Sequence, residues 1–114
     1  ERWSNDSIPV AGATFREFVS MLYQENRLIR GQMCLAGKKI RLSEITCPIL
    51  LLVADKDHLV PPRSTLALKP MVRSPDVTTL SIRAGHIGLA VGSRALRELW
   101  PSAADWIASH STRR

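Results

Sequence analysis

The 114 residues suffice for one small domain, and 45% apolar with 23% charged residues is typical of a globular protein rather than a disordered or fibrous one. The longest apolar run with strand character, from Ile49 to Ala54, is far shorter than the roughly 20 residues of a membrane-spanning helix, so we expect no membrane association. Sixteen Lys and Arg against ten Asp and Glu give a net charge of +6, which favours anionic partners in general. These positive residues are scattered and lack interleaved aromatic residues, so we expect no nucleic-acid binding.

Cysteine and histidine usage excludes several kinds of site. Cys34 and Cys47 are too few for a disulfide scaffold and lack C-x-x-C spacing, which indicates a reducing, cytoplasmic setting. His58, His86 and His110 show no ligand spacing with Asp or Cys, so we expect no metal site. Neither G-x-G-x-x-G nor G-x-x-x-x-G-K-[ST] occurs, and we therefore expect no bound cofactor.

Residues 1–46 predict one helix and a small hairpin. Five apolar residues recur with helical spacing: Phe15, Phe18, Val19, Leu22 and Tyr23. The helix should begin near Ala13 or Thr14, after Gly12. Further on, Met33–Leu35 and Lys39–Leu42 flank Ala36–Lys38, a pattern typical of two short strands joined by a turn. We expect this part to be an appendage rather than a core.

Residues 47–114 are predicted to form the core of the fold. The run Ile49–Ala54, bounded by Pro48, predicts a strand buried on both faces in a parallel sheet. A polar loop should lead to a helix around Ser64–Val72, and the β-branched run Val77–Ile82 predicts a second strand. This strand should end in a turn over Ala84–Gly88.

The spacing of apolar residues after Gly92 predicts a C-terminal helix. Its apolar stripe consists of Leu96, Leu99, Trp100, Ala103 and Ile107. Pro101 should either kink this helix or start a second segment. The order strand, helix, strand, helix indicates an α/β fold with a parallel pair of strands.

Titratable residues follow both predicted strands. The first strand leads into Asp55, Asp57 and His58, and the second leads to His86 between small residues. In open α/β sheets, functional residues gather outside the carboxyl ends of the strands. The chain order Asp before His is also the order of these two residues in the catalytic triad of α/β-hydrolases. A carboxylate there would fix the histidine tautomer so that the other ring nitrogen can accept a proton. The same residues could also be an ordinary loop histidine and a turn or capping aspartate.

Two sequence motifs resemble those of one protein family. Ala54–Pro62, which reads ADKDHLVPP, and Gly85–Gly88, which reads GHIG, are similar to the C-terminal part of the polyhydroxyalkanoate synthases. The resemblance extends upstream to Trp3–Asp6 and Leu22–Leu28, and downstream to the region around Glu98–Pro101. It implies the C-terminal portion of an α/β-hydrolase fold: a cap-exit helix and hairpin over residues 1–46, then the last two parallel core strands with their helices over 47–114.

The resemblance also implies a chemistry. These synthases polymerise (R)-3-hydroxyacyl-coenzyme A into polyester and release coenzyme A through a Cys-Asp-His triad. Matched motif by motif, Asp57 is the triad carboxylate and His86 the general base, whereas Asp55 has no assigned catalytic role. His58 is expected to support the pair by hydrogen bonding, and Trp3 to pack between cap and core. The acyl-coenzyme A is a substrate rather than a cofactor, and no residue is assigned to binding it.

The nucleophile of the family is missing from this sequence. No G-x-C-x-G elbow occurs in the 114 residues, and neither Cys34 nor Cys47 lies on a strand-to-helix elbow. Cys47 precedes its predicted strand and is therefore at the wrong end to meet His86. We expect the chain to be a synthase fragment that is inactive alone and whose unpaired strand edges favour association.

Other functions remain open at this stage. A serine elbow in the missing part would indicate another α/β-hydrolase, such as an esterase or depolymerase. A non-catalytic module that binds a synthase partner or the polymer granule is a further alternative, and a nucleic-acid binder comes last. For the synthase we expect a cytoplasmic enzyme, at the granule surface, with a second copy or a second synthase subunit as partner.

Overall fold

The structure of the chain, a computed structural model, describes residues 8–111. Trp3 and the rest of the segment Trp3–Asp6, for which the sequence predicts a packing role and a family resemblance, lie outside the described residues. Two compact units divide between Arg41 and Leu42, five residues before the boundary expected from the sequence, and each is described by itself. The short 3-10 helix η3 (Leu42–Glu44) falls in the second unit, where the Arg73 amide donates to the Ile45 carbonyl oxygen at 3.1 Å.

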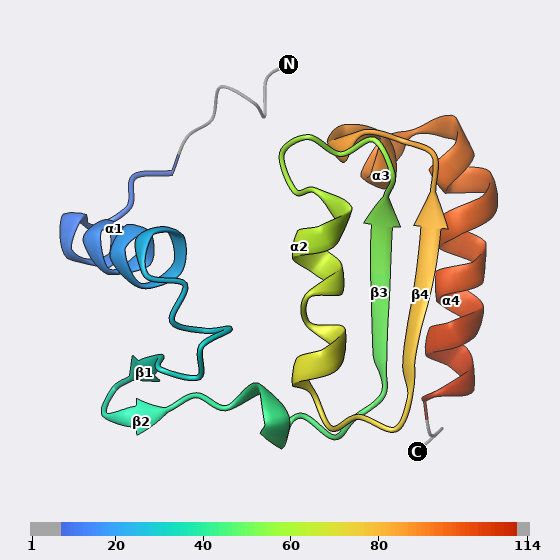
Figure 1. The fold of residues 1–114 in the computed structure, drawn as a ribbon. Helices are drawn as coiled ribbons and strands as arrows, with labels where there is room; N and C mark the ends of the chain where they lie inside the picture. Colours follow the sequence, from blue (N-terminus) through green and yellow to red (C-terminus); the bar gives the residue numbers. More distant parts are fainter. Residues whose placement is uncertain (1–7, 112–114) are drawn as a thin grey trace. The chain divides into compact units, whose positions relative to one another are not determined.

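The first unit contains the expected helix and hairpin. Helix α1 (Gly12–Phe18) continues directly as a π-helical segment, η2 (Val19–Gln24). Strands β1 (Cys34–Leu35) and β2 (Lys38–Lys39) pair antiparallel (Figure 1). The two turn residues, Ala36 and Gly37, have φ of 49° and 76°, which is the left-handed geometry of a tight hairpin turn.

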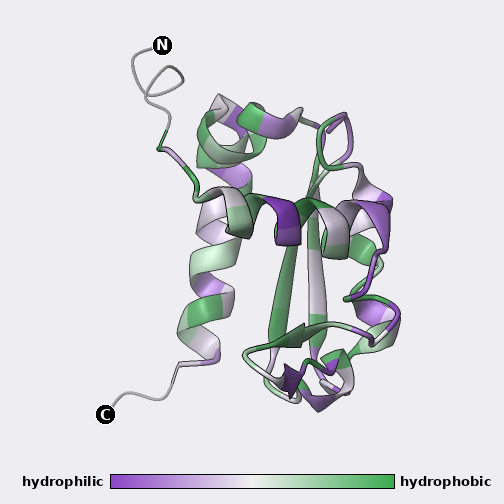
Figure 2. Ribbon diagram, turned by 90° about the vertical axis from the view of Figure 1, so that its left-hand side faces the viewer, coloured by the Kyte–Doolittle hydropathy of each residue, from purple (hydrophilic) through white to green (hydrophobic). Residues whose placement is uncertain are grey.

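The second unit is built on the expected parallel pair. Strand β3 (Ile49–Ala54) pairs with β4 (Val77–Ile82), and the register runs from Ile49 opposite Val77 to Ala54 opposite Ile82 (Figure 1). Figure 2 shows β3 hydrophobic along its length and β4 mixed. This agrees with their burial, since Leu51, Val53 and Ala54 are buried in β3 and only Ile82 in β4.

The connection between the two strands is less helical than expected. Helix α2 (Pro62–Leu66) starts with a proline in its first turn and is followed by a separate 3-10 turn, η4 (Lys69–Met71). The sequence predicts one helix around Ser64–Val72. Pro70 explains the break, because proline lacks the backbone N–H and its ring clashes with the carbonyl four residues earlier.

The segment after β4 corrects a second expectation. Instead of a turn over Ala84–Gly88, helix α3 (His86–Val91) begins at His86, with Gly85 extended just before it. A π-helical segment, η5 (Ala95–Leu99), then runs into α4 (Trp100–Ser109). Pro101 sits in the first turn of α4, just after the π-helical segment gives way to the α-helix, which agrees with the second-segment alternative.

The core of the second unit lies between β4 and η5. Ile82, Ala95 and Leu99 form its buried centre, and Leu52, Leu80, Ala84 and Leu89 pack against it. The predicted stripe of the C-terminal helix is partly right, because Leu99 and Ala103 are buried as expected. It is wrong at Leu96 and Ile107, which are 59% and 56% exposed, and it omits Ala95, which is buried.

A hydrogen-bonded network fastens the end of α4 to the start of β4. Nε2 of His110 lies 2.7 Å from the Asp76 carboxylate, and Nδ1 lies 2.7 Å from the Trp106 carbonyl oxygen. The Trp106 indole donates to the Thr78 hydroxyl at 3.0 Å, and that hydroxyl donates to Asp76 at 3.1 Å. The rings of Trp106 and His110 stack with centroids 3.9 Å apart. This network lies at the opposite end of the strands from Asp57.

Candidate active site

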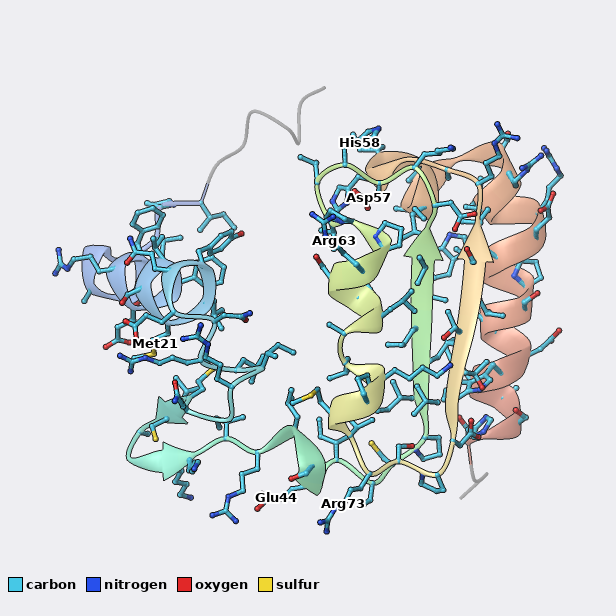
Figure 3. The ribbon with its side chains drawn as sticks, viewed as in Figure 1. Met21, Glu44, Asp57, His58, Arg63 and Arg73 are labelled. Carbon is cyan, nitrogen blue, oxygen red and sulfur yellow. The ribbon has the colours of Figure 1, made fainter. Side chains whose placement is uncertain are left out.

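The carboxyl ends of β3 and β4 carry the candidate site. Because the strands are parallel, both chain segments leave the sheet at the same edge, and Figure 3 shows Asp57 and His58 in the loop after β3. Backbone hydrogen bonds continue the pairing beyond the strands. The Asp55 amide donates to the Ile82 carbonyl and the Lys56 amide donates to the Ala84 carbonyl, both at 3.0 Å.

Asp57 is the buried carboxylate of this edge, with 6% of its surface exposed. Its Oδ1 accepts hydrogen bonds from the Leu59 amide at 2.9 Å and the Val60 amide at 2.8 Å, so the loop folds around the side chain. Burial alone would raise the pKa of Asp57. The hydrogen bonds from Val60, His86 and Leu59 outweigh burial and hold this pKa below its ordinary value, so the side chain is ionised at neutral pH.

The structure brings His86 to Asp57, as the sequence predicts. Nδ1 of His86 lies 2.8 Å from Oδ2 of Asp57. Since an ionised carboxylate only accepts, Nδ1 is the donor of this hydrogen bond, and the tautomer that the bond selects has its lone pair on Nε2. Within residues 8–111, Nε2 makes no hydrogen bond, and 47% of the His86 side chain is exposed. The ring is therefore oriented by a buried acid and free to accept a proton at Nε2.

An open hollow of about 340 Å³ lies beside the exposed face of His86. Its lining comes from the loop after β3, from Gly85 and from the first turn of α3: Lys56, His58, Leu59, Gly85, His86, Ile87 and Gly88. Leu59 and Ile87 are 75% and 57% exposed, so two apolar side chains flank the imidazole. A reacting group in this hollow would meet a base surrounded by apolar surface.

The remaining candidates have different surroundings. His58 is exposed and lines the hollow, but it makes no hydrogen bond within the described part of the chain, so its supporting role stays a prediction. Asp55 accepts a hydrogen bond from the Ser81 hydroxyl. Cys34 and Cys47 are exposed free thiols. Cys47 lies just before β3, at the opposite end of the strand from His86, as expected from the sequence.

Two contacts of the site were not anticipated from the sequence. They are the amide bonds to Asp57 from Leu59 and Val60, and the bond between Asp55 and Ser81. The sequence gives only a weak signal for the bonds from Leu59 and Val60 to Asp57. An aspartate in a loop often accepts hydrogen bonds from the backbone amides two or three residues after it. The bond between Asp55 and Ser81 needs the strand register, which places Ser81 opposite Val53, two residues before Asp55.

The described residues offer neither a metal site nor a membrane-spanning helix. Between residues 8 and 111, no group of three His, Cys, Asp or Glu side chains is arranged to hold a metal ion. No helix in the same range has the length and apolar character needed to cross a membrane.

The known proteins that are similar to this chain share one name. No protein-family model matches the chain. It is 43% identical over 107 residues to the "Poly(3-hydroxyalkanoate) polymerase subunit PhaC" of Allochromatium vinosum, covering 94% of this chain and 30% of that protein. The subunit of the same name from Haloferax mediterranei is 40% identical over 111 residues, or 97% of this chain and 23% of its own length. That from Synechocystis is 42% identical over 108 residues, with 94% and 29% covered.

The chain thus spans less than a third of the length of these curated relatives, while nearly all of it is matched. The parallel sheet and its helices are in keeping with an α/β fold. By sequence, nearly all of the chain is similar to one region of the poly(3-hydroxyalkanoate) polymerase subunits named PhaC.

Proposed function

We propose that the chain supplies the acid and the base of a polyester polymerase that consumes (R)-3-hydroxyacyl-coenzyme A and releases coenzyme A. The observation that carries this proposal is the 2.8 Å contact between Asp57 Oδ2 and His86 Nδ1, with Nε2 left unbonded among the described residues. The names of the relatives support the substrate class, since each is a poly(3-hydroxyalkanoate) polymerase subunit. The fold proposed for the whole protein is an α/β-hydrolase, and this chain would be its C-terminal portion.

In the proposed mechanism, Nε2 of His86 takes the proton of a cysteine thiol, and Asp57 stabilises the resulting imidazolium. The thiolate attacks the thioester carbon of the substrate, the bond from that carbon to the coenzyme A sulfur breaks, and the proton on His86 passes to the departing sulfur. His86 then removes the proton from the hydroxyl of a hydroxyacyl unit, and this oxygen attacks the acyl carbon on the cysteine. The new ester bond forms as the bond from that carbon to the cysteine sulfur breaks, and the proton on His86 returns to the sulfur.

The cysteine of this scheme must come from outside the 114 residues, because they contain no G-x-C-x-G elbow. Cys47 cannot take its place, since it lies before β3 while His86 lies beyond the end of β4. We propose that the rest of the polymerase supplies the elbow, and that the assembled enzyme works in the cytoplasm at the polymer granule, as a dimer or with a second subunit.

The test is a chimera in which this chain replaces the matching part of the Allochromatium vinosum subunit. Coenzyme A release from (R)-3-hydroxybutyryl-coenzyme A is measured with a thiol reagent. We expect activity in the chimera and a loss of at least about 100-fold in His86→Ala and Asp57→Asn, the scale of general acid–base catalysis. His110→Gln is the matched control, because His110 forms the other Asp–His pair of the chain, at the far end of the sheet.

Undiminished coenzyme A release in His86→Ala would refute the proposed base. Release of free hydroxy acid with no growth of polymer would instead indicate a hydrolase. Full activity in the control variant is required, since a loss there would mean that the assay reports folding rather than chemistry.

A further inference from the structure

Asp55 and Ser81 join the two segments that carry the candidate site. Asp55 is the first residue after β3, and Ser81 is the last but one of β4. Because side chains alternate along a strand, Asp55 lies on the same face as Val53, the residue opposite Ser81. The Ser81 hydroxyl donates to Oδ1 of Asp55, so a side-chain bond crosses from the end of one strand to the other.

The loop beyond this bond has few other anchors. Leu59 and Val60 are 75% and 44% exposed, so apolar packing does little to hold the segment that surrounds Asp57. The Asp55 amide bonds to Ile82 at the end of β4, the Lys56 amide bonds to Ala84 just beyond that strand, and the Asp57 amide bonds to the Ala54 carbonyl oxygen at 3.1 Å. Asp57 thus lies two residues after Asp55, in a loop that is held mainly by hydrogen bonds.

We propose that the Asp55–Ser81 bond is a positioning clamp that holds the loop after β3 so that the Asp57 carboxylate meets Nδ1 of His86. The inference rests on the proposed function, in which this pair is the catalytic acid and base. Neither Asp55 nor Ser81 touches the reacting atoms in this scheme; both act through Asp57. Positioning of this kind matters because a displacement of about 1 Å in a catalytic group can cost about 100-fold in rate.

The clamp is tested on the whole 114-residue chain by NMR. The proton on Nδ1 of His86 gives a far-downfield signal only while it is hydrogen-bonded to the carboxylate and shielded from exchange with water. We expect Ser81→Ala and Asp55→Ala to lose this signal. Asp55→Asn retains an oxygen that accepts from Ser81, and Ser81→Thr retains the hydroxyl, so both should keep it.

Thr78→Val provides a matched control. It also removes a hydroxyl from β4 that donates to an aspartate, but at the end of the strand near Asp76. This variant should lower the stability of the chain and leave the His86 signal in place. Loss of the signal in Thr78→Val would show that the signal follows general stability, which would overturn a specific clamp.

The outcomes separate the clamp from the function on which it rests. Persistence of the signal in Asp57→Ala, which has no acceptor for Nδ1, would refute the Asp57–His86 pair itself, and with it the proposed function. Loss of the signal in Asp57→Ala but not in Ser81→Ala or Asp55→Ala would refute the clamp alone. Equal loss in Asp55→Asn and Asp55→Ala would mean that the charge of Asp55 acts, rather than its bond. If Ser81→Ala does not fold, the comparison of these two Asp55 variants decides.

Discussion

Asp57 receives hydrogen bonds from two loop amides and one imidazole, and these donors favour its ionised form. Burial opposes ionisation, but the bonds from Val60, His86 and Leu59 prevail, so the pKa of Asp57 in the folded chain lies below the ordinary value of about 3.9. A carboxyl whose pKa falls on folding stabilises the fold above its unfolded pKa, and this stabilisation is lost as the pH drops through the folded pKa.

We therefore expect Asp57→Asn to be less stable than the unmodified chain at pH 7, with the difference shrinking once the pH falls below about 4. Urea unfolding midpoints, followed by circular dichroism across this range, measure the effect. Asp105→Asn is the control, because Asp105 is exposed on α4, and it should leave the midpoint unchanged throughout. A constant difference between Asp57→Asn and the unmodified chain would contradict the pH dependence.

At the scale of single elements, the turn between β1 and β2 places a residue with a β-carbon in left-handed backbone geometry. Ala36 has φ of 49°, a conformation that costs an ordinary residue about 1–2 kcal/mol, while asparagine adopts it more readily. We expect Ala36→Asn to stabilise the hairpin by about 1 kcal/mol. Amide exchange of Ile40, which donates to the Met33 carbonyl oxygen at 2.8 Å beside the hairpin, measures the change. Gly37→Ala should act in the opposite direction, and faster exchange in Ala36→Asn would contradict the prediction.

The end of α3 depends on a close backbone approach at Gly92. A β-carbon at this position would lie 2.5 Å from the Gly88 carbonyl oxygen, so the backbone would have to shift. We expect Gly92→Ala to lower the free energy of unfolding by roughly 1–3 kcal/mol, as overpacking does. Gly85→Ala is the comparison, since its β-carbon would be 3.8 Å from the nearest neighbour, the Lys56 carbonyl oxygen. Chemical denaturation of both variants tests this, and equal losses would contradict it.

The elements also show what the sequence can and cannot predict. Both long strands were predicted with their observed bounds, because an apolar run and a β-branched run between polar loops leave little choice. The meeting of Asp57 and His86 follows from the parallel order of those strands. The start of a helix at His86 was missed, because its glycine-flanked sequence is typical of a turn. The buried face of the last helix was predicted only in part: Leu99 and Ala103 are buried as expected, but Ala95 was missed because a small side chain gives little signal of burial.

At the scale of the whole molecule, the network around His110 should make the docking of α4 depend on pH. The Trp106 carbonyl oxygen and then the Asp76 carboxylate raise the pKa of His110, since both ring nitrogens face acceptors, and the neighbouring Ser109 hydroxyl donates to the same carbonyl. A histidine whose pKa rises on folding stabilises the fold below its unfolded pKa of about 6.5, and this stabilisation is lost as the pH rises through the folded pKa.

We expect the second unit to be more stable at pH 5.5 than at pH 8.5, and this difference to shrink in His110→Gln. Thermal unfolding followed by circular dichroism at the two pH values measures this difference. His58→Gln is the control, since His58 is an exposed loop residue at the other end of the strands, and it should retain the difference. An unchanged pH dependence in His110→Gln would show that His110 is not its source.

The parallel sheet of the described residues has two open edges. Among residues 8–111, β3 and β4 pair only with each other, so each has an outer edge whose backbone groups find no strand. Parallel sheets occur almost entirely as buried, multi-stranded structures, and open edges favour pairing with other chains. The relatives are more than three times as long as the matched region, so the rest of such a polymerase is the natural source of further strands.

We therefore expect the isolated chain to associate through its strand edges in a concentration-dependent way. Light scattering after size-exclusion chromatography measures the association, and slower amide exchange in β3 at high concentration would locate it at the edge. Val91→Lys tests the competing explanation, because Val91 is 67% exposed on α3 and lies outside the sheet. If that substitution alone made the chain monomeric, the apolar helix surface would be the contact; if association persists, the strand edges remain its source.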